Sequence, residues 1–139
     1  LGVVLEFGVG GDEKVESSSQ LTKNYLGNIE KRPWGSYQII AKNNGYQIKE
    51  INVSNGSKLS LQKHSNRSEF WQIIEGKSKI TIENNEYYLK EKEHIYIPKN
   101  TIHRIENIGN EELIFIEIQL GKNLNEEDII RLEDDYGRV

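Results

Sequence analysis

Four polar side chains are spaced so that they could bind one metal ion, namely Gln62, His64, Glu69 and His103. Gln62 and His64 stand two apart, so on a strand both would point to the same face. Glu69 lies five residues beyond His64, which is enough to cross a short turn and return on the next strand. Any one of them alone reads more simply as a solvated surface group. The joint spacing instead predicts a shared site, which His103 on a later strand would complete.

This donor set contains two imidazoles, one carboxylate and one amide oxygen. Zn, Fe, Mn, Co and Ni all accept such a mixture, and composition alone does not choose among them. The chain has no cysteine, which excludes disulfides and thiolate metal sites. Ligands that come from separate strands leave an open position for water or substrate. The pattern therefore predicts a divalent metal centre that can also bind a substrate.

The elements that must position these residues read as short strands separated by turns. Apolar and polar residues alternate, and Asn and Gly punctuate the chain at short intervals. The candidate strands are 37–40, 46–53, 59–61, 71–74, 80–82, 87–89, 95–97, the segment around Ile105, and 113–120. Alternation with period two and turns at this spacing predict an all-β sandwich or barrel.

The end of the chain reads differently, as a short helix. Asn125 could cap it, and the acidic run 126–128 suits the positive first turn. Apolar residues within 129–132 would supply a buried stripe, and Gly137 would follow the last turn.

The first part of the chain is expected to be an arm rather than a folded unit. Residues 10–31 are polar and open with a Gly-Gly-Asp break, with room for a helical turn at 20–26. Residues 1–9 are apolar but have no preceding basic residue, so they lack the front end of a secretion signal. We therefore divide the chain into an N-terminal arm or linker, 1–31, and one domain, 32–139.

Composition narrows the class of protein. The 139 residues suffice for one domain, and 35% hydrophobic and 29% charged residues are ordinary for a soluble protein. The net charge is −4 and no basic cluster could follow a phosphate backbone, so nucleic acid is not an expected partner. The sequence contains no apolar run long enough to predict a transmembrane helix. With no cysteine, a cytoplasmic location is the default expectation.

The spacing of these residues resembles the two signature motifs of the cupin superfamily. In the first motif, with Gln62 in place of the first His, the matching positions are Gly56, Gln62, His64, Glu69 and Gly76. In the second, Lys92 and Asn100 stand in place of two glycines, and the matching positions are Pro98, His103 and Asn107. The resemblance implies a cupin double-stranded β-helix, or jelly-roll, barrel, to which the chain would add the short C-terminal helix.

More closely, residues 32–138 resemble the C-terminal isomerase domain of the bifunctional mannose-6-phosphate isomerase/mannose-1-phosphate guanylyltransferase family, the type II phosphomannose isomerases. The phrases that carry this are 32–37, 59–62, 67–71, 96–98, 103–107 and 128–138. The family usually has three consecutive histidines where this chain has His64-Ser65-Asn66, and a His where it has Phe70. Residues 1–31 do not resemble its nucleotide-binding start, so this chain alone should not transfer a guanylyl group.

The resemblance implies an enzyme of carbohydrate metabolism, in polysaccharide biosynthesis, that interconverts mannose 6-phosphate and fructose 6-phosphate. It implies a divalent ion, for which we expect zinc, held by Gln62, His64, Glu69 and His103. It also implies a homodimer that binds a small sugar phosphate and neither nucleic acid nor membrane.

Three cations are the candidate catalytic contacts to the substrate. Lys49 and Arg104 are on predicted strands and could face the cavity, and Arg138 in the tail could fold over its mouth. For each of them the simpler reading is a solvated surface charge.

Three other functions remain open at this point. The replaced histidines favour a non-catalytic cupin that binds a sugar phosphate or nucleotide sugar and partners a separate guanylyltransferase. A metal-dependent dioxygenase is disfavoured because such enzymes more often have His at the position of Gln62. A purely structural barrel would not need all four ligand positions.

Overall fold

The computed structural model describes residues 26–138 as two antiparallel sheets. The helical turn expected at 20–26 and most of the expected arm lie outside the described residues. The first described strand, β1 (Ile29–Arg32), already begins before the expected domain boundary at residue 32. The described part of the chain contains no helix with the length and apolarity that a membrane crossing needs.

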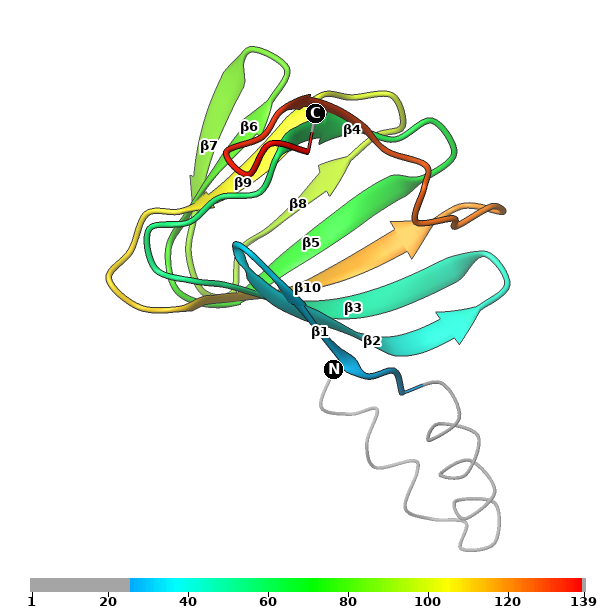
Figure 1. The fold of residues 1–139 in the computed structure, drawn as a ribbon, viewed down its shortest axis with the longest axis horizontal. Helices are drawn as coiled ribbons and strands as arrows, with labels where there is room; N and C mark the ends of the chain where they lie inside the picture. Colours follow the sequence, from blue (N-terminus) through cyan, green and yellow to red (C-terminus); the bar gives the residue numbers. More distant parts are fainter. Residues whose placement is uncertain (1–25, 139) are drawn as a thin grey trace, which may run out of the picture.

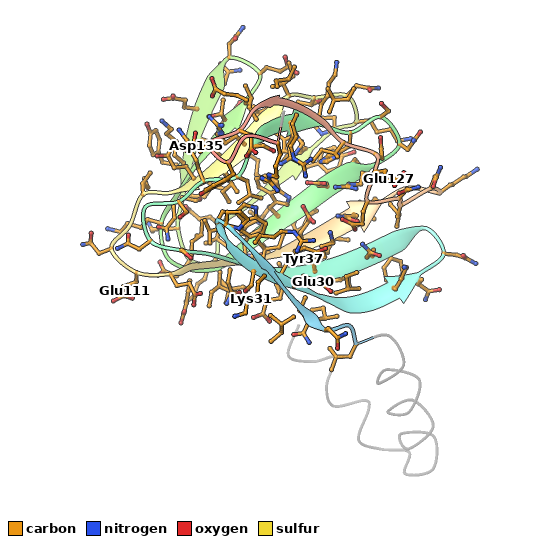
Figure 2. All side chains as sticks on the ribbon, viewed as in Figure 1. Glu30, Lys31, Tyr37, Glu111, Glu127 and Asp135 are labelled. Carbon is orange, nitrogen blue, oxygen red and sulfur yellow. The ribbon has the colours of Figure 1, made fainter. Side chains whose placement is uncertain are left out.

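The two sheets face each other, and side chains from both fill the space between them (Figures 1 and 2). One sheet has six strands in the order β1-β2-β3-β10-β5-β8, and the other has five in the order β11-β4-β9-β6-β7. The remaining strands are β2 (Gly35–Asn43), β3 (Tyr46–Val53), β4 (Leu61–Lys63), β5 (Ser68–Glu75), β6 (Ser78–Ile82), β7 (Asn85–Leu89), β8 (His94–Ile97), β9 (His103–Asn107), β10 (Leu113–Leu120) and β11 (Ile130–Glu133).

The inner face of the six-stranded sheet is apolar at one end and polar at the other. Strands β3 and β10 pair in a regular register, and every second residue of each is buried. From the apolar to the polar end, the inward pairs are Leu113 with Val53, Phe115 with Ile51, Glu117 with Lys49 and Gln119 with Gln47. Burial of the apolar rows drives the two sheets together. The buried polar rows need partners, and the row of Glu117 and Lys49 forms part of the wall of a cavity.

Two of the four glycine positions of the cupin motifs are occupied here by other residues, yet all four have a positive φ. The angles are 77° and 95° at Gly56 and Gly76, and 76° and 56° at Lys92 and Asn100. A left-handed conformation costs an ordinary L-residue roughly 1–2 kcal/mol. Backbone hydrogen bonds offset this, because the Lys92 amide donates to Ile73 O and the Asn100 amide to His64 O. The second bond ties the loop before His103 to another ligand position.

The predicted C-terminal helix is wrong, because residues 125–138 form turns and the short strand β11. Asn125 does act as a cap, since its Oδ1 accepts from the Glu127 amide, but only one turn follows. Beyond it, β11 pairs with β4. The acidic residues expected in a first helical turn instead bind the barrel, Glu126 through Lys49 and Asp128 through the amides of the 64–69 turn. Tertiary contacts thus override a weak local helix preference.

Candidate metal centre

Three of the four predicted metal ligands come together in the interior. His64 follows β4, Glu69 is the second residue of β5, and His103 begins β9. One donor atom of each residue lies within 4.8 Å of the others, and all three side chains are buried. The turn between His64 and β5 returns the chain to the opposite sheet. The two sheets therefore supply the imidazoles from one side and the carboxylate from the other.

Both imidazoles are held so that their Nε2 atoms face the carboxylate. His64 Nδ1 is 2.7 Å from Asp128 O, and His103 Nδ1 is 2.8 Å from Thr101 O. A carbonyl oxygen only accepts, so each Nδ1 donates and each Nε2 keeps its lone pair. His64 Nε2 lies 3.2 Å from Glu69 Oε2, and His103 Nε2 lies 3.7 Å from Glu69 Oε1. Backbone carbonyls on Nδ1 are the usual way in which proteins orient metal-binding imidazoles.

The electrostatics of the site keep both imidazoles neutral. Burial, and next the charge of Arg67, lower the pKa of His64 to about 4. Burial also lowers the pKa of His103. Two neutral Nε2 lone pairs therefore face a carboxylate, and acceptors repel one another unless a cation lies among them. Two neutral imidazoles and one carboxylate fit a divalent ion. Protein sites without cysteine bind such ions through these two kinds of ligand.

The guanidinium of Arg67 is the nearest positive charge to these lone pairs. Its Nε donates to Glu69 Oε2 at 2.8 Å, and its Nη2 lies 3.2 Å from His64 Nε2. Burial disfavours its charge, but the carboxylates of Glu69 and Glu117 outweigh burial and raise the pKa of Arg67. Arg67 thus lies between the metal centre and the cavity beside it.

Gln62, the fourth predicted ligand, neighbours His103 across strands β4 and β9. Its amide nitrogen donates to Ser60 Oγ at 2.9 Å, which leaves the carbonyl oxygen Oε1 as its potential donor to a metal. Gln62 also lines the adjoining cavity. The structure therefore brings Gln62 beside the group formed by His64, Glu69 and His103.

A cavity of about 300 Å³ opens beside Gln62 and Arg67, whereas His64, Glu69 and His103 do not line it. Both sheets and the C-terminal tail contribute to its wall. Its charged or polar lining residues are Arg32, Lys49, Ser60, Gln62, Arg67, Glu117, Glu126, Arg131 and Arg138, and its apolar or aromatic ones are Trp34, Tyr37, Ile51, Leu59 and Ile129. Five cations and two carboxyl groups line this space, so it favours an anionic ligand.

Two of the three predicted substrate contacts line this cavity. Lys49 forms a 2.9 Å ion pair with Glu126, and Arg138 is held by Asp134 through Nε at 2.8 Å. Arg104 is placed elsewhere and does not line it. Its Nε donates to Leu59 O at 2.8 Å and its Nη1 to Glu133 Oε1 at 2.7 Å, so it ties β9 to the tail. Its side chain is occupied in holding the fold.

Sequence reasoning missed two acidic residues of the site. Glu117 lies in the cavity wall, where Trp71 Nε1 donates to both Glu69 Oε1 at 3.0 Å and Glu117 Oε2 at 3.2 Å. The second is Asp128, whose carboxylate accepts from the amides of Ser65 and Asn66 at 2.9 and 2.8 Å. Glu117 alternates with isoleucines along β10, where Glu117 faces inward and the isoleucines face outward. A lone acidic residue between buried Phe115 and Gln119 was its only signal.

The fold defines the class of protein. In solved structures it is similar to the capsular polysaccharide assembling protein CapF from Staphylococcus aureus, with a TM-score of 0.69 and 23% identity over 78% of this chain and 34% of that one. It is also similar to the cupin domain of Schizosaccharomyces pombe Cnp3, with a TM-score of 0.60 and 13% identity over 68% of both chains. The predicted jelly-roll barrel is confirmed, because the chain has the cupin fold.

The sequence comparison defines the family. Residues 20–134 match the family described as Mannose-6-phosphate isomerase C-terminal, and the chain belongs to that family. It is 43% identical over 108 residues to alginate biosynthesis protein AlgA of Pseudomonas aeruginosa, and 44% identical over 108 residues to mannose-1-phosphate guanylyltransferase of Escherichia coli K12. These alignments cover 78% of this chain but only 22% and 23% of the two relatives, so the chain spans about a fifth of their length.

Proposed function

We propose that this protein is a metal-dependent isomerase that interconverts mannose 6-phosphate and fructose 6-phosphate. One observation carries the proposal: Arg67 contacts Glu69 and His64 of the candidate metal group and also lines a cavity with four other cations. Membership of the mannose-6-phosphate isomerase family supports the choice of sugar. A divalent ion, for which we propose zinc, would be bound by these three residues and Gln62.

The reaction moves a proton between C1 and C2 of the sugar through an enediol. The bound ion would supply positive charge beside the oxygen that becomes negative. The chain's own groups prepare the site for this. The carbonyls of Asp128 and Thr101 orient the imidazoles, and Trp71 Nε1 holds Glu69. Glu126 fixes Lys49 and Asp134 fixes Arg138. Both cations would therefore bind a sugar phosphate with little further loss of side-chain freedom.

The positions at which the family's histidines are replaced do not argue against catalysis. Phe70 alternates with the inward residues Glu69 and Trp71 on β5, so it lies on the outer face, where its ring stacks on His94 at 5.2 Å. Ser65 and Asn66 are exposed in the turn. Of the described residues that line the cavity, none is at these three positions.

One contact favours a second function, sugar-phosphate binding without catalysis beside a separate guanylyltransferase. The guanidinium of Arg67 contacts both Glu69 and His64, so its N–H groups occupy the acceptor atoms that a metal would use. In that case the cavity would bind the ligand and the barrel would serve as a partner of the enzyme that supplies the chemistry. The homodimer and the cytoplasmic location remain predictions.

A coupled isomerase assay separates the two functions. The protein is stripped of metal, reloaded in turn with Zn, Mn, Co, Ni and Fe(II), and supplied with mannose 6-phosphate. We expect turnover with at least one metal, loss of turnover in His64→Ala, and unchanged turnover in His94→Ala, which removes a histidine from the outer face. No turnover with any metal, alongside measurable binding of mannose 6-phosphate, would replace the isomerase by the binding function.

A further inference from the structure

Arg131 lies in the same cross-strand row as two metal-site residues. It pairs with Gln62 between β11 and β4, and Gln62 pairs with His103 between β4 and β9. Neighbouring strands lie 4.7–4.9 Å apart, so the backbones of Arg131 and His103 are separated by about 10 Å. Arg131 and Gln62 both line the cavity. The row therefore leads from His103 of the metal centre, through Gln62, to Arg131 in the cavity.

Arg131 differs from the neighbouring cavity cations in its pairing. Lys49 is paired with Glu126, Arg67 with Glu69, and Arg138 with Asp134. Among residues 26–138, the Nε–H of Arg131 and Nη1 of Arg67 are both buried without a hydrogen-bond partner, but only Arg67 of the two also forms an ion pair with a carboxylate. An unsatisfied buried donor on a charged group is destabilising. Such a group therefore indicates a binding site for a ligand that would accept its hydrogen bond.

Like charges are also held together in this part of the cavity. Burial, and next the positive charge of Arg138, lower the pKa of Arg131, and Arg32 acts in the same direction, while the carboxylate of Asp134 partly offsets them. Asp134 fixes Arg138 through three hydrogen bonds, two from the guanidinium and one from the backbone amide. The repulsion between Arg131, Arg138 and Arg32 is relieved when an anion binds among them.

We propose that Arg131, with Arg138 and Arg32, forms an anion subsite in the cavity that binds the phosphate of the substrate, on the side of Gln62 opposite to His103. A guanidinium presents N–H groups in a fixed fork that matches phosphate oxygens. A sugar phosphate that spans the row would place its carbonyl carbons near the metal and its phosphate at Arg131. Arg131 would thus select sugars phosphorylated at the carbon remote from the carbonyl. The identity of the sugar rests on the proposed function, whereas the anion subsite itself does not.

The test uses the metal-free full chain and measures binding rather than turnover. Inorganic phosphate, mannose 6-phosphate and mannose are titrated by calorimetry into the wild type, Arg131→Gln and Lys63→Gln. Lys63 is the matched control, because it lies next to Gln62 on β4, pairs with Ile130 and does not line the cavity within the described chain. Both variants lose one positive charge.

We expect Arg131→Gln to bind phosphate and mannose 6-phosphate about 10- to 100-fold more weakly than the wild type. Lys63→Gln should stay within about 2-fold, and mannose should bind all three proteins equally weakly. A nitrogen-15 NMR titration of the wild type needs no variant and covers the case in which Arg131→Gln fails to fold. In it, phosphate should shift the Arg131 Nε–H signal.

Equal phosphate affinity of Arg131→Gln and the wild type, or an Arg131 Nε–H signal that phosphate does not shift, would overturn the subsite. Isomerase turnover is scored separately. If no metal supports turnover but Arg131→Gln loses phosphate binding, the isomerase proposal fails and the anion subsite stands. If turnover occurs and phosphate binding is independent of Arg131, the reverse holds.

Discussion

The metal centre and the cationic cavity next to it are built for ligands of opposite charge. At the metal centre, Glu69 and the Nε2 atoms of His64 and His103 bring together groups that accept, and backbone carbonyls occupy the remaining imidazole nitrogens. In the cavity, Arg131, Arg138 and Arg32 bring together groups that donate. The first group is formed by strands of the barrel and the second largely by the C-terminal tail.

This difference teaches that the barrel and the tail have separate tasks. The barrel fixes a group of lone pairs in the interior, with Glu69 on the long paired strand β5 and the imidazoles held by backbone carbonyls. The tail adds cations through the four-residue strand β11 and a few side-chain contacts. Changes in the barrel should therefore alter mainly cation binding, and changes in the tail mainly anion binding. The following predictions test how separate the two effects are.

The largest effect is expected from Glu69→Gln. It removes the only carboxylate among the predicted ligands and leaves the buried Arg67 without its ion-pair partner. Affinity for zinc, measured by competition with a chromogenic chelator, should fall by more than about 1,000-fold, beyond the 10- to 100-fold that follows loss of an outer hydrogen bond. The matched control is Glu127→Gln in the exposed turn, which should bind zinc as the wild type does. Equal losses in both variants would refute the assignment.

The second prediction concerns pH. Burial, and next the charge of Glu69, raise the pKa of Glu117 to about 7, so the native state holds a proton that the unfolded chain releases above about 4.5. This group makes the protein less stable as pH rises from about 4.5 to about 7. His64, with a pKa near 4 instead of 6.5, acts in the opposite sense, because the unfolded chain takes up the proton first as pH falls. The two groups oppose each other between pH 4.5 and 6.5.

Glu117→Gln removes one side of this balance. Between pH 6.5 and 4.5, the free energy of unfolding of the metal-free variant should fall by about 3 kcal/mol more than that of the wild type, two pH units at about 1.4 kcal/mol each. Urea unfolding at several pH values measures this. Glu112→Gln, at an exposed position before β10, is the control. Parallel pH curves for the wild type and Glu117→Gln would show that Glu117 titrates normally.

A smaller effect is expected from Asp128→Ala. The carboxylate of Asp128 holds the amides of Ser65 and Asn66, and its backbone carbonyl orients His64. Losing the carboxylate should loosen the turn and lower zinc affinity about 10-fold, while Asp135→Ala at the exposed end of the tail should leave it unchanged. Unaltered affinity in Asp128→Ala would mean that the backbone bond alone orients His64.

The smallest effect is expected from Phe70→His, which restores the residue that the family usually has. Because Phe70 lies on the outer face of β5, zinc affinity and isomerase turnover should each stay within about 2-fold of the wild type. Metal titration and the coupled assay measure both. A marked gain in turnover would show that the outer face takes part in the reaction.

Much of the barrel could be predicted from the sequence, since strands 46–53 and 113–120 have the predicted bounds. Period-two alternation reports burial on one face, and the motif spacing placed the ligands at strand ends. The same alternation did not single out Glu117, because in the sequence a buried polar side chain cannot be told from a surface one without its partners. The helix predicted for the tail was wrong for a related reason. Glu126 and Asp128 fit the first turn of a helix locally, but their partners lie on β3 and in the turn before β5. Contacts between residues so far apart in the sequence cannot be predicted from a short stretch of it.

The alternation of β5 also constrains how this gene can change. His64 and Glu69 are joined by a turn of fixed length, and Glu69 faces inward while Phe70 faces out. Inserting or deleting one codon in that turn would shift the register by one residue and exchange the two faces. A phenyl ring would then enter the ligand group and the carboxylate would leave it. Length changes in this turn should therefore be tolerated far less than substitutions at Ser65 or Asn66.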